Sequence, residues 1–63
     1  MGRNQLIFEL MKEREKYKRL REMERHVHPD YVDVLAYKIL ASEKRLEALR
    51  RELAREMEAE QAV

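Results

Sequence analysis

Pro29 is the only proline in a chain of 63 residues, and it stands between two long stretches of helix-forming residues. Leu, Met, Glu, Lys and Arg dominate both stretches, with Ala added in the second, and these residue types have high helix propensities. A proline disrupts a helix interior and restricts the residue before it, but the first helical turn tolerates it well. The pattern therefore predicts two helices joined at a corner, with His28 as the N-cap of the second and Asp30 in its first turn.

The predicted fold class is all-α, an antiparallel two-helix hairpin. We expect a single domain over residues 1–63, with a helix at about 4–26, a turn at about 27–29, a helix at about 30–60 and a frayed tail at 61–63. Folding the chain at residue 28 would bring Leu20 opposite Leu35 to Ala36, Tyr17 near Ile39, Leu10 near Leu46 and Leu6 near Leu49.

Apolar residues of the second helix recur in steps of three and four, the spacing of a coiled-coil seam. The seam consists of Val32, Leu35, Ile39, Ser42, Leu46, Leu49 and Leu53, and Ser42 is its one polar member. The first helix has a weaker seam, in which Glu13 and Glu24 occupy positions that should be apolar. The two seams predict that the helices pack against each other.

The hairpin carries more apolar surface than one partner helix can cover. Beyond the seam, the start of the second helix adds Tyr31, Val34, Ala36, Tyr37, Leu40 and Ala41. A chain of this size buries only about 60% of its unfolded surface, and with no cysteine it has no disulfide to support its core. We therefore expect a homodimer of hairpins, a four-helix bundle. The expected interface residues are Leu10, Tyr17, Leu20, Val32, Leu35, Ile39, Leu46, Leu49, Leu53 and Met57, the last two lying past the end of the first helix.

The charges nearly cancel, with 14 basic against 13 acidic residues, so the chain as a whole does not attract polyanions. Residues 1–28 have a net charge of +3 and residues 29–63 of −2, which favours packing of the two halves against each other. No apolar run approaches the length of a membrane span, and the start lacks a signal-peptide pattern. We expect a cytoplasmic protein with no membrane partner; its richness in Glu, Lys and Arg is typical of thermophiles.

Two groups of side chains are candidates for ligand binding. His26, His28 and Asp30 carry donor atoms that hold divalent metals, but they alternate across the corner rather than sharing a helix face, so we expect neither a metal nor another cofactor. Lys16, Arg19 and Arg21 could contact phosphates, although acidic residues interleave them. In architecture and length the chain resembles Rop-type hairpins, dimeric RNA-loop-binding regulators of plasmid copy number, and that resemblance implies nucleic-acid binding.

Two further resemblances rest on short segments. Ser42-Glu43-Lys44-Arg45-Leu46 is similar, at its serine alone, to the motif of the sporulation-phosphorelay phosphatases, whose expected Asp is here Leu46. That likeness implies a regulator of a signalling protein. Pro29-Asp30-Tyr31-Val32 and Glu13-Arg14-Glu15 resemble parts of the all-helical chorismate mutases, but the long first helix and arginines of that fold have no counterpart here.

The sequence favours a small non-enzymatic interaction or adaptor protein that acts by coiled-coil-like self-association and binds an unidentified protein. A serine nucleophile needs an activating base, and no histidine is spaced to serve Ser42. The alternatives left open are a nucleic-acid-binding hairpin of the Rop type and a phosphorelay-type regulator.

Overall fold

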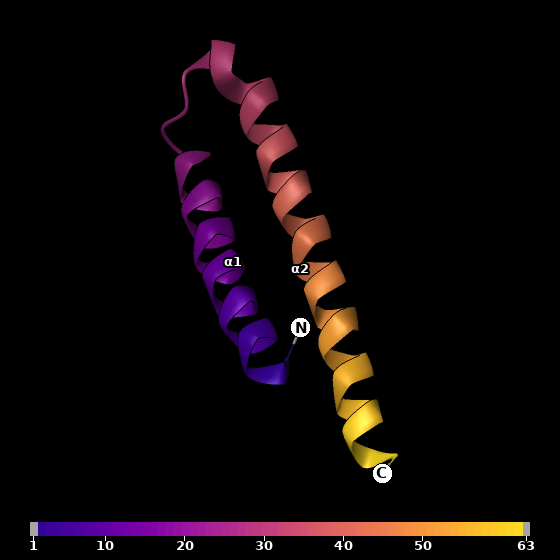
Figure 1. Ribbon diagram of the computed structural model, residues 1–63. Helices are drawn as coiled ribbons and strands as arrows, with labels where there is room; N and C mark the ends of the chain where they lie inside the picture. Colours follow the sequence, from indigo (N-terminus) through magenta and orange to yellow (C-terminus); the bar gives the residue numbers. More distant parts are fainter. Residues whose placement is uncertain (1, 63) are drawn as a thin grey trace.

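Two helices lie side by side and run in opposite directions (Figure 1). The computed structural model describes residues 2–62; α1 spans Arg3–Met23, the short 3-10 helix η1 spans Pro29–Tyr31, and α2 spans Val32–Gln61. These residues contain no strand, which confirms the all-α prediction at the level of two packed helices. Of the tail expected to fray, Gln61 belongs to α2, and Val63 lies outside the described residues.

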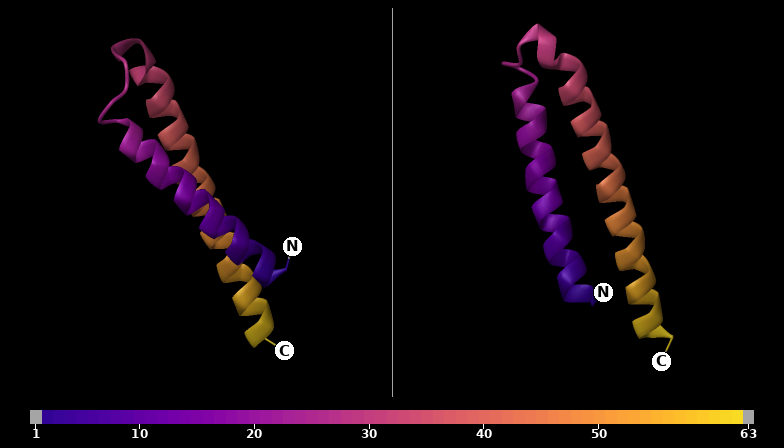
Figure 2. Two further views of the ribbon diagram at one scale, coloured as in Figure 1. Left: turned by 90° about the vertical axis from the view of Figure 1, so that its left-hand side faces the viewer. Right: turned by 45° about the horizontal axis from the view of Figure 1, so that its top comes forward.

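The hairpin is long and narrow, measuring 53 × 15 × 14 Å. The start of α1 and the end of α2 lie at the same end of the molecule, and α2 continues past the start of α1 (Figures 1 and 2). Within residues 2–62, neither helix combines the length and the apolar character that crossing a membrane requires.

The first helix ends at Met23, earlier than the expected position near residue 26. After Met23, each backbone N–H bonds to the carbonyl three residues earlier, as in a 3-10 helix. The last of these bonds runs from the His26 N–H to the Met23 carbonyl over 3.1 Å. Glu24, Arg25 and His26 are all acceptable in a helix, so their own preferences do not end it. The chain must instead leave the helix early enough to turn back toward α2.

Pro29 forms the corner in the predicted way. His28, the residue before it, is extended, with φ −65° and ψ 140°, as the proline ring requires. The His28 Nδ1 atom accepts a hydrogen bond from the Asp30 N–H over 3.1 Å, so His28 is the N-cap of η1 and Asp30 lies in its first turn. The first turn of the second helix is thus a 3-10 turn that runs directly into α2.

The core is one row of buried side chains that runs along the contact between the helices. Its buried apolar residues are Leu6, Leu20, Leu35, Ile39, Leu46 and Leu49. Near the corner, Leu20, Leu35 and Ile39 form one cluster, and Tyr17, Val27 and Tyr31 pack against it. This grouping agrees with the predicted register, in which Leu20 faces Leu35 and Tyr17 faces Ile39.

Some predicted seam residues are only partly covered within one hairpin. Leu10, Tyr17 and Leu53 are half-buried, whereas Val32 is 47% exposed and Met57 is 43% exposed. Val32 lies just after η1, and Tyr31 packs on the core cluster there instead. Met57 lies near the C-terminal end of α2, and this end of α2 continues past the start of α1 (Figure 1).

Candidate interaction surfaces

A polar layer crosses the core where both seams carry a polar residue. The Ser42 hydroxyl donates a hydrogen bond to the Glu13 carboxylate over 2.6 Å, and Ser42 is 2% exposed. The short distance is typical of a charge-assisted hydrogen bond. Each residue interrupts the apolar seam of its own helix, and neither seam by itself pairs them. With its hydroxyl buried and donated to Glu13, Ser42 has the surroundings of a structural side chain.

Three further contacts join the helices at the surface. The Tyr17 hydroxyl donates to Glu43 over 3.2 Å. Two ion pairs link the halves of opposite net charge, Arg3 with Glu60 at 3.1 Å and Arg45 with Glu9 at 3.8 Å. Such exposed pairs contribute about 0–1 kcal/mol each, so they support the register rather than provide most of the stability.

The corner holds the three weak metal candidates. The His28 Nδ1 atom is engaged as the helix cap and lies 3.6 Å from the Asp30 carboxylate. His26 is exposed and lines a shallow groove with Met23, Val27 and Tyr31. Across residues 2–62, no three His, Cys, Asp or Glu side chains gather as a metal site would require.

The three candidate phosphate contacts are exposed on α1 but are not equivalent. Arg21 forms an ion pair with Glu24 at 3.1 Å. Lys16 and Arg19 are three residues apart, share one side of the helix, and line a groove with Phe8 and Arg45. Lys12 lines the same groove, so Lys16 and Arg19 are two of its four cations, and within residues 2–62 Arg45 is the one paired with a carboxylate, that of Glu9.

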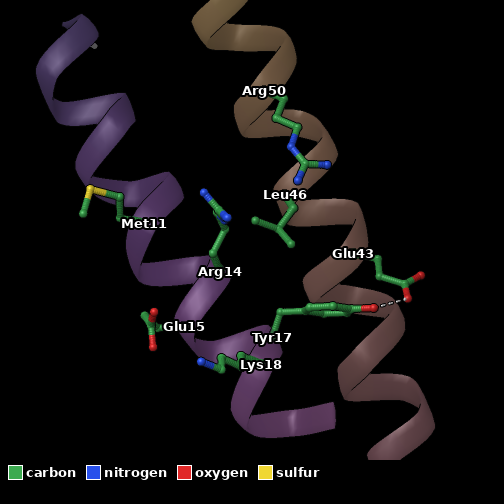
Figure 3. A pocket seen from close by; sticks show the side chains of 8 residues that line it. All are labelled: Met11, Arg14, Glu15, Tyr17, Lys18, Glu43, Leu46 and Arg50. Carbon is green, nitrogen blue, oxygen red and sulfur yellow. Dashed lines mark hydrogen bonds between the residues drawn. The ribbon is translucent and has the colours of Figure 1, made fainter.

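A further groove, which we name the side groove, lies between the helices and is lined by three cationic side chains, Arg14, Lys18 and Arg50. It has a volume of about 710 Å³ and is lined by Met11, Arg14, Glu15, Tyr17, Lys18, Glu43, Leu46 and Arg50. Figure 3 shows Arg14 from α1 and Arg50 from α2 extending toward the space between the helices, with Leu46 beside them. Among residues 2–62, neither arginine has a carboxylate oxygen within 4.0 Å.

A smaller groove, which we name the corner groove, lies nearer the turn than the side groove does. It has a volume of about 330 Å³ and is lined mainly by apolar side chains: Val27, Val32, Leu35, Ala36 and Ile39, with Glu24 at its edge. Ala36 is its α2 residue with the smallest side chain. A short side chain at this position leaves space for an apolar group from outside the hairpin.

Large apolar side chains remain exposed at the start of α2. Val32, Val34, Tyr37 and Leu40 are 44–76% exposed, with Tyr37 the most open. On α1, Phe8 and Met11 are each 60% exposed, and the Lys12 ammonium lies 5.3 Å from the centre of the Phe8 ring. The predicted excess of apolar surface on the second helix is therefore present in the folded hairpin.

Comparison with known proteins finds no family model, curated protein or solved structure that matches this chain.

Proposed function

We propose that this protein is a small interaction module whose hairpins associate into a four-helix bundle and bind another protein. The supporting observation is the group of four apolar side chains at Val32–Leu40 that α1 leaves 44–76% exposed. A helix that is apolar on several sides is ordinarily covered on several sides, and α1 covers only one. Association supplies the burial that a chain of this size otherwise lacks.

The exposed residues do not all point the same way, so they serve two contacts. Val32 and Leu40 flank the side of α2 that continues the core seam, where a second hairpin would complete a bundle. Tyr37 is 76% exposed and lies on the side of α2 away from α1. An exposed tyrosine with neighbouring apolar residues is a typical anchor in protein interfaces, and we assign this outer side to the protein partner.

The test of self-association is sedimentation equilibrium of the whole chain over a range of concentrations, combined with thermal melts followed by circular dichroism. We expect a dimer mass and a melting midpoint that rises with concentration, because association stabilises the folded state by mass action. A monomer mass with a midpoint independent of concentration would contradict the proposal.

A Rop-type nucleic-acid-binding hairpin is the second candidate, favoured by the exposed neighbours Lys16 and Arg19 on α1. The same dimer preparation tests it by titration with a structured RNA and a DNA duplex at low salt. Phosphate-dominated binding would weaken steeply as salt is added, and substitution of both residues by alanine would reduce the slope. Absence of binding at low salt would remove this candidate and leave the first unaffected.

A further inference from the structure

We propose that the second copy packs its α2 antiparallel against α2 of the first, pairing Ala36 with Met57 and Glu43 with Arg50 across a two-fold axis. The inference rests on the proposed self-association and specifies its surface and its orientation.

One line of residues along α2 carries the argument. Ala36, Glu43, Arg50 and Met57 are spaced by seven residues, so they lie two helical turns apart along one side of the helix. Ala36, Glu43 and Arg50 each follow a seam residue directly, and Met57 lies one turn beyond Leu53. The heptad line therefore lies beside the buried seam rather than opposite it. Ala36 lines the corner groove, and Glu43 and Arg50 line the side groove.

The heptad line is complementary to itself when it is reversed. A two-fold axis at the middle of the line, between residues 46 and 47, brings position 36 onto 57 and position 43 onto 50. The small Ala36 then meets the large Met57, and the acidic Glu43 meets the basic Arg50. Each pairing occurs twice, because a two-fold interface is isologous. The same axis lies at the middle of α2, Val32–Gln61, so the two helices overlap along their full length of about 45 Å.

The charges at the centre are available for this pairing. Figure 3 shows Glu43 and Arg50 on the same stretch of α2, at the two ends of the side groove. Arg50 has no carboxylate oxygen within 4.0 Å in the described chain, and Glu43 receives only the neutral Tyr17 hydroxyl. Arg14 and Lys18 border the same groove, so they would strengthen the attraction of an approaching carboxylate. Glu47 lies close to the axis, and its charge is already balanced by Arg51 at 2.7 Å.

The apolar ends fit in the same arrangement. Met57 is 43% exposed, and its flexible side chain adapts to irregular cavities. The corner groove of the second copy, where Ala36 leaves space, lies opposite it. Leu40, which is 49% exposed, falls opposite Leu53, which is half-buried. A parallel arrangement would instead place Glu43 on Glu43 and Arg50 on Arg50, which like charges disfavour.

Cysteine cross-linking tests the orientation. The chain has no natural cysteine, so only the introduced cysteines can form disulfides. Ala36→Cys and Met57→Cys variants are oxidised separately and as a mixture, and products are identified by mass. We expect a mixed disulfide between the two variants and little dimer from either alone. In the antiparallel arrangement, equal positions 36 lie about 32 Å apart along the helix, too far for a disulfide.

The possible outcomes separate this inference from the proposed function. Disulfides within each variant alone, without the mixed product, would show a parallel dimer and overturn the pairing. No cross-link in a protein that sediments as a dimer would overturn this interface while leaving self-association in place. A monomer mass for the unmodified chain would remove both.

Charge reversal provides an independent readout that requires no oxidation. Arg50→Glu should weaken dimerisation about tenfold, because it creates two Glu–Glu contacts, and Glu43→Arg combined with Arg50→Glu should restore it. Glu52→Arg is the matched control on the same helix and should have no effect, since Glu52 lies off the heptad line. Equal weakening by Arg50→Glu and Glu52→Arg, with no restoration in the double variant, would overturn the pairing.

Discussion

At the scale of single residues, the contact between Glu13 and Ser42 is the most informative interaction in the hairpin. A purely apolar layer could slide along the seam at little cost, whereas a hydroxyl and a carboxylate that meet at 2.6 Å hold one register. Glu13 is half-buried, so its carboxylate keeps some contact with water while Ser42 is enclosed. The layer therefore favours register specificity more than stability.

The contact between Glu13 and Ser42 predicts an asymmetry between single and double substitutions. Ser42→Ala should lower the free energy of unfolding by about 1 kcal/mol, because Glu13 loses its donor within the interface. Glu13→Leu combined with Ser42→Ala should be at least as stable as the unmodified chain, since apolar groups replace both partners. Urea denaturation followed by circular dichroism measures both values. A double variant less stable than Ser42→Ala would contradict this account.

At the scale of elements, the corner depends on Pro29 and on the cap that precedes it. Histidine is a poor N-cap by preference, yet the His28 Nδ1 atom accepts the Asp30 N–H bond at 3.1 Å. His28→Ser should therefore raise the free energy of unfolding by about 0.5 kcal/mol, and His28→Ala should lower it by about 0.5–1 kcal/mol. His26→Ala is the matched control and should have little effect, because His26 is exposed and precedes the corner. Urea midpoints that shift equally for the two alanine variants would argue against a capping role.

The same elements show which features could be predicted from the sequence. Two helices, the proline corner and the register of Leu20 against Leu35 follow from propensity and spacing, which are local signals. The end of α1 at Met23 does not, because Glu24, Arg25 and His26 are all acceptable in a helix and their preferences mark no end there.

The candidate surface was predictable only in part. The register that pairs Leu20 with Leu35 also places Glu13 opposite Ser42, so their contact was implicit in the two seams. Within residues 2–62, Arg50 is left without an ion pair because other basic side chains bind the nearby carboxylates, as Arg51 binds Glu47. Only the three-dimensional structure shows this choice of partners. The excess of apolar residues at the start of α2 was evident from the sequence. Which of these side chains α1 leaves exposed to solvent was not.

At the scale of the whole molecule, stability and association are expected to be linked. A chain of this size has a folding free energy of about 3–9 kcal/mol on the usual per-residue scale. One file of six buried apolar residues is a small core for that purpose. Burial of a second surface between two copies would add to it, so the hairpin and the dimer should melt together.

Three neighbouring positions on α2 test this linkage, because each faces a different environment. Ile39 is 8% exposed in the core, Leu40 is 49% exposed beside the heptad line, and Tyr37 is 76% exposed on the outer side. Ile39→Asp should cost about 4 kcal/mol or more, since it removes apolar burial and encloses an unpaired carboxylate, and the chain should unfold and dissociate together. Leu40→Asp should reduce the dimer mass in sedimentation and lower the melting midpoint, whereas Tyr37→Asp should leave both unchanged. A folded monomer from Ile39→Asp would contradict the linkage, as would a Leu40→Asp variant that dissociates while keeping the midpoint of the unmodified protein.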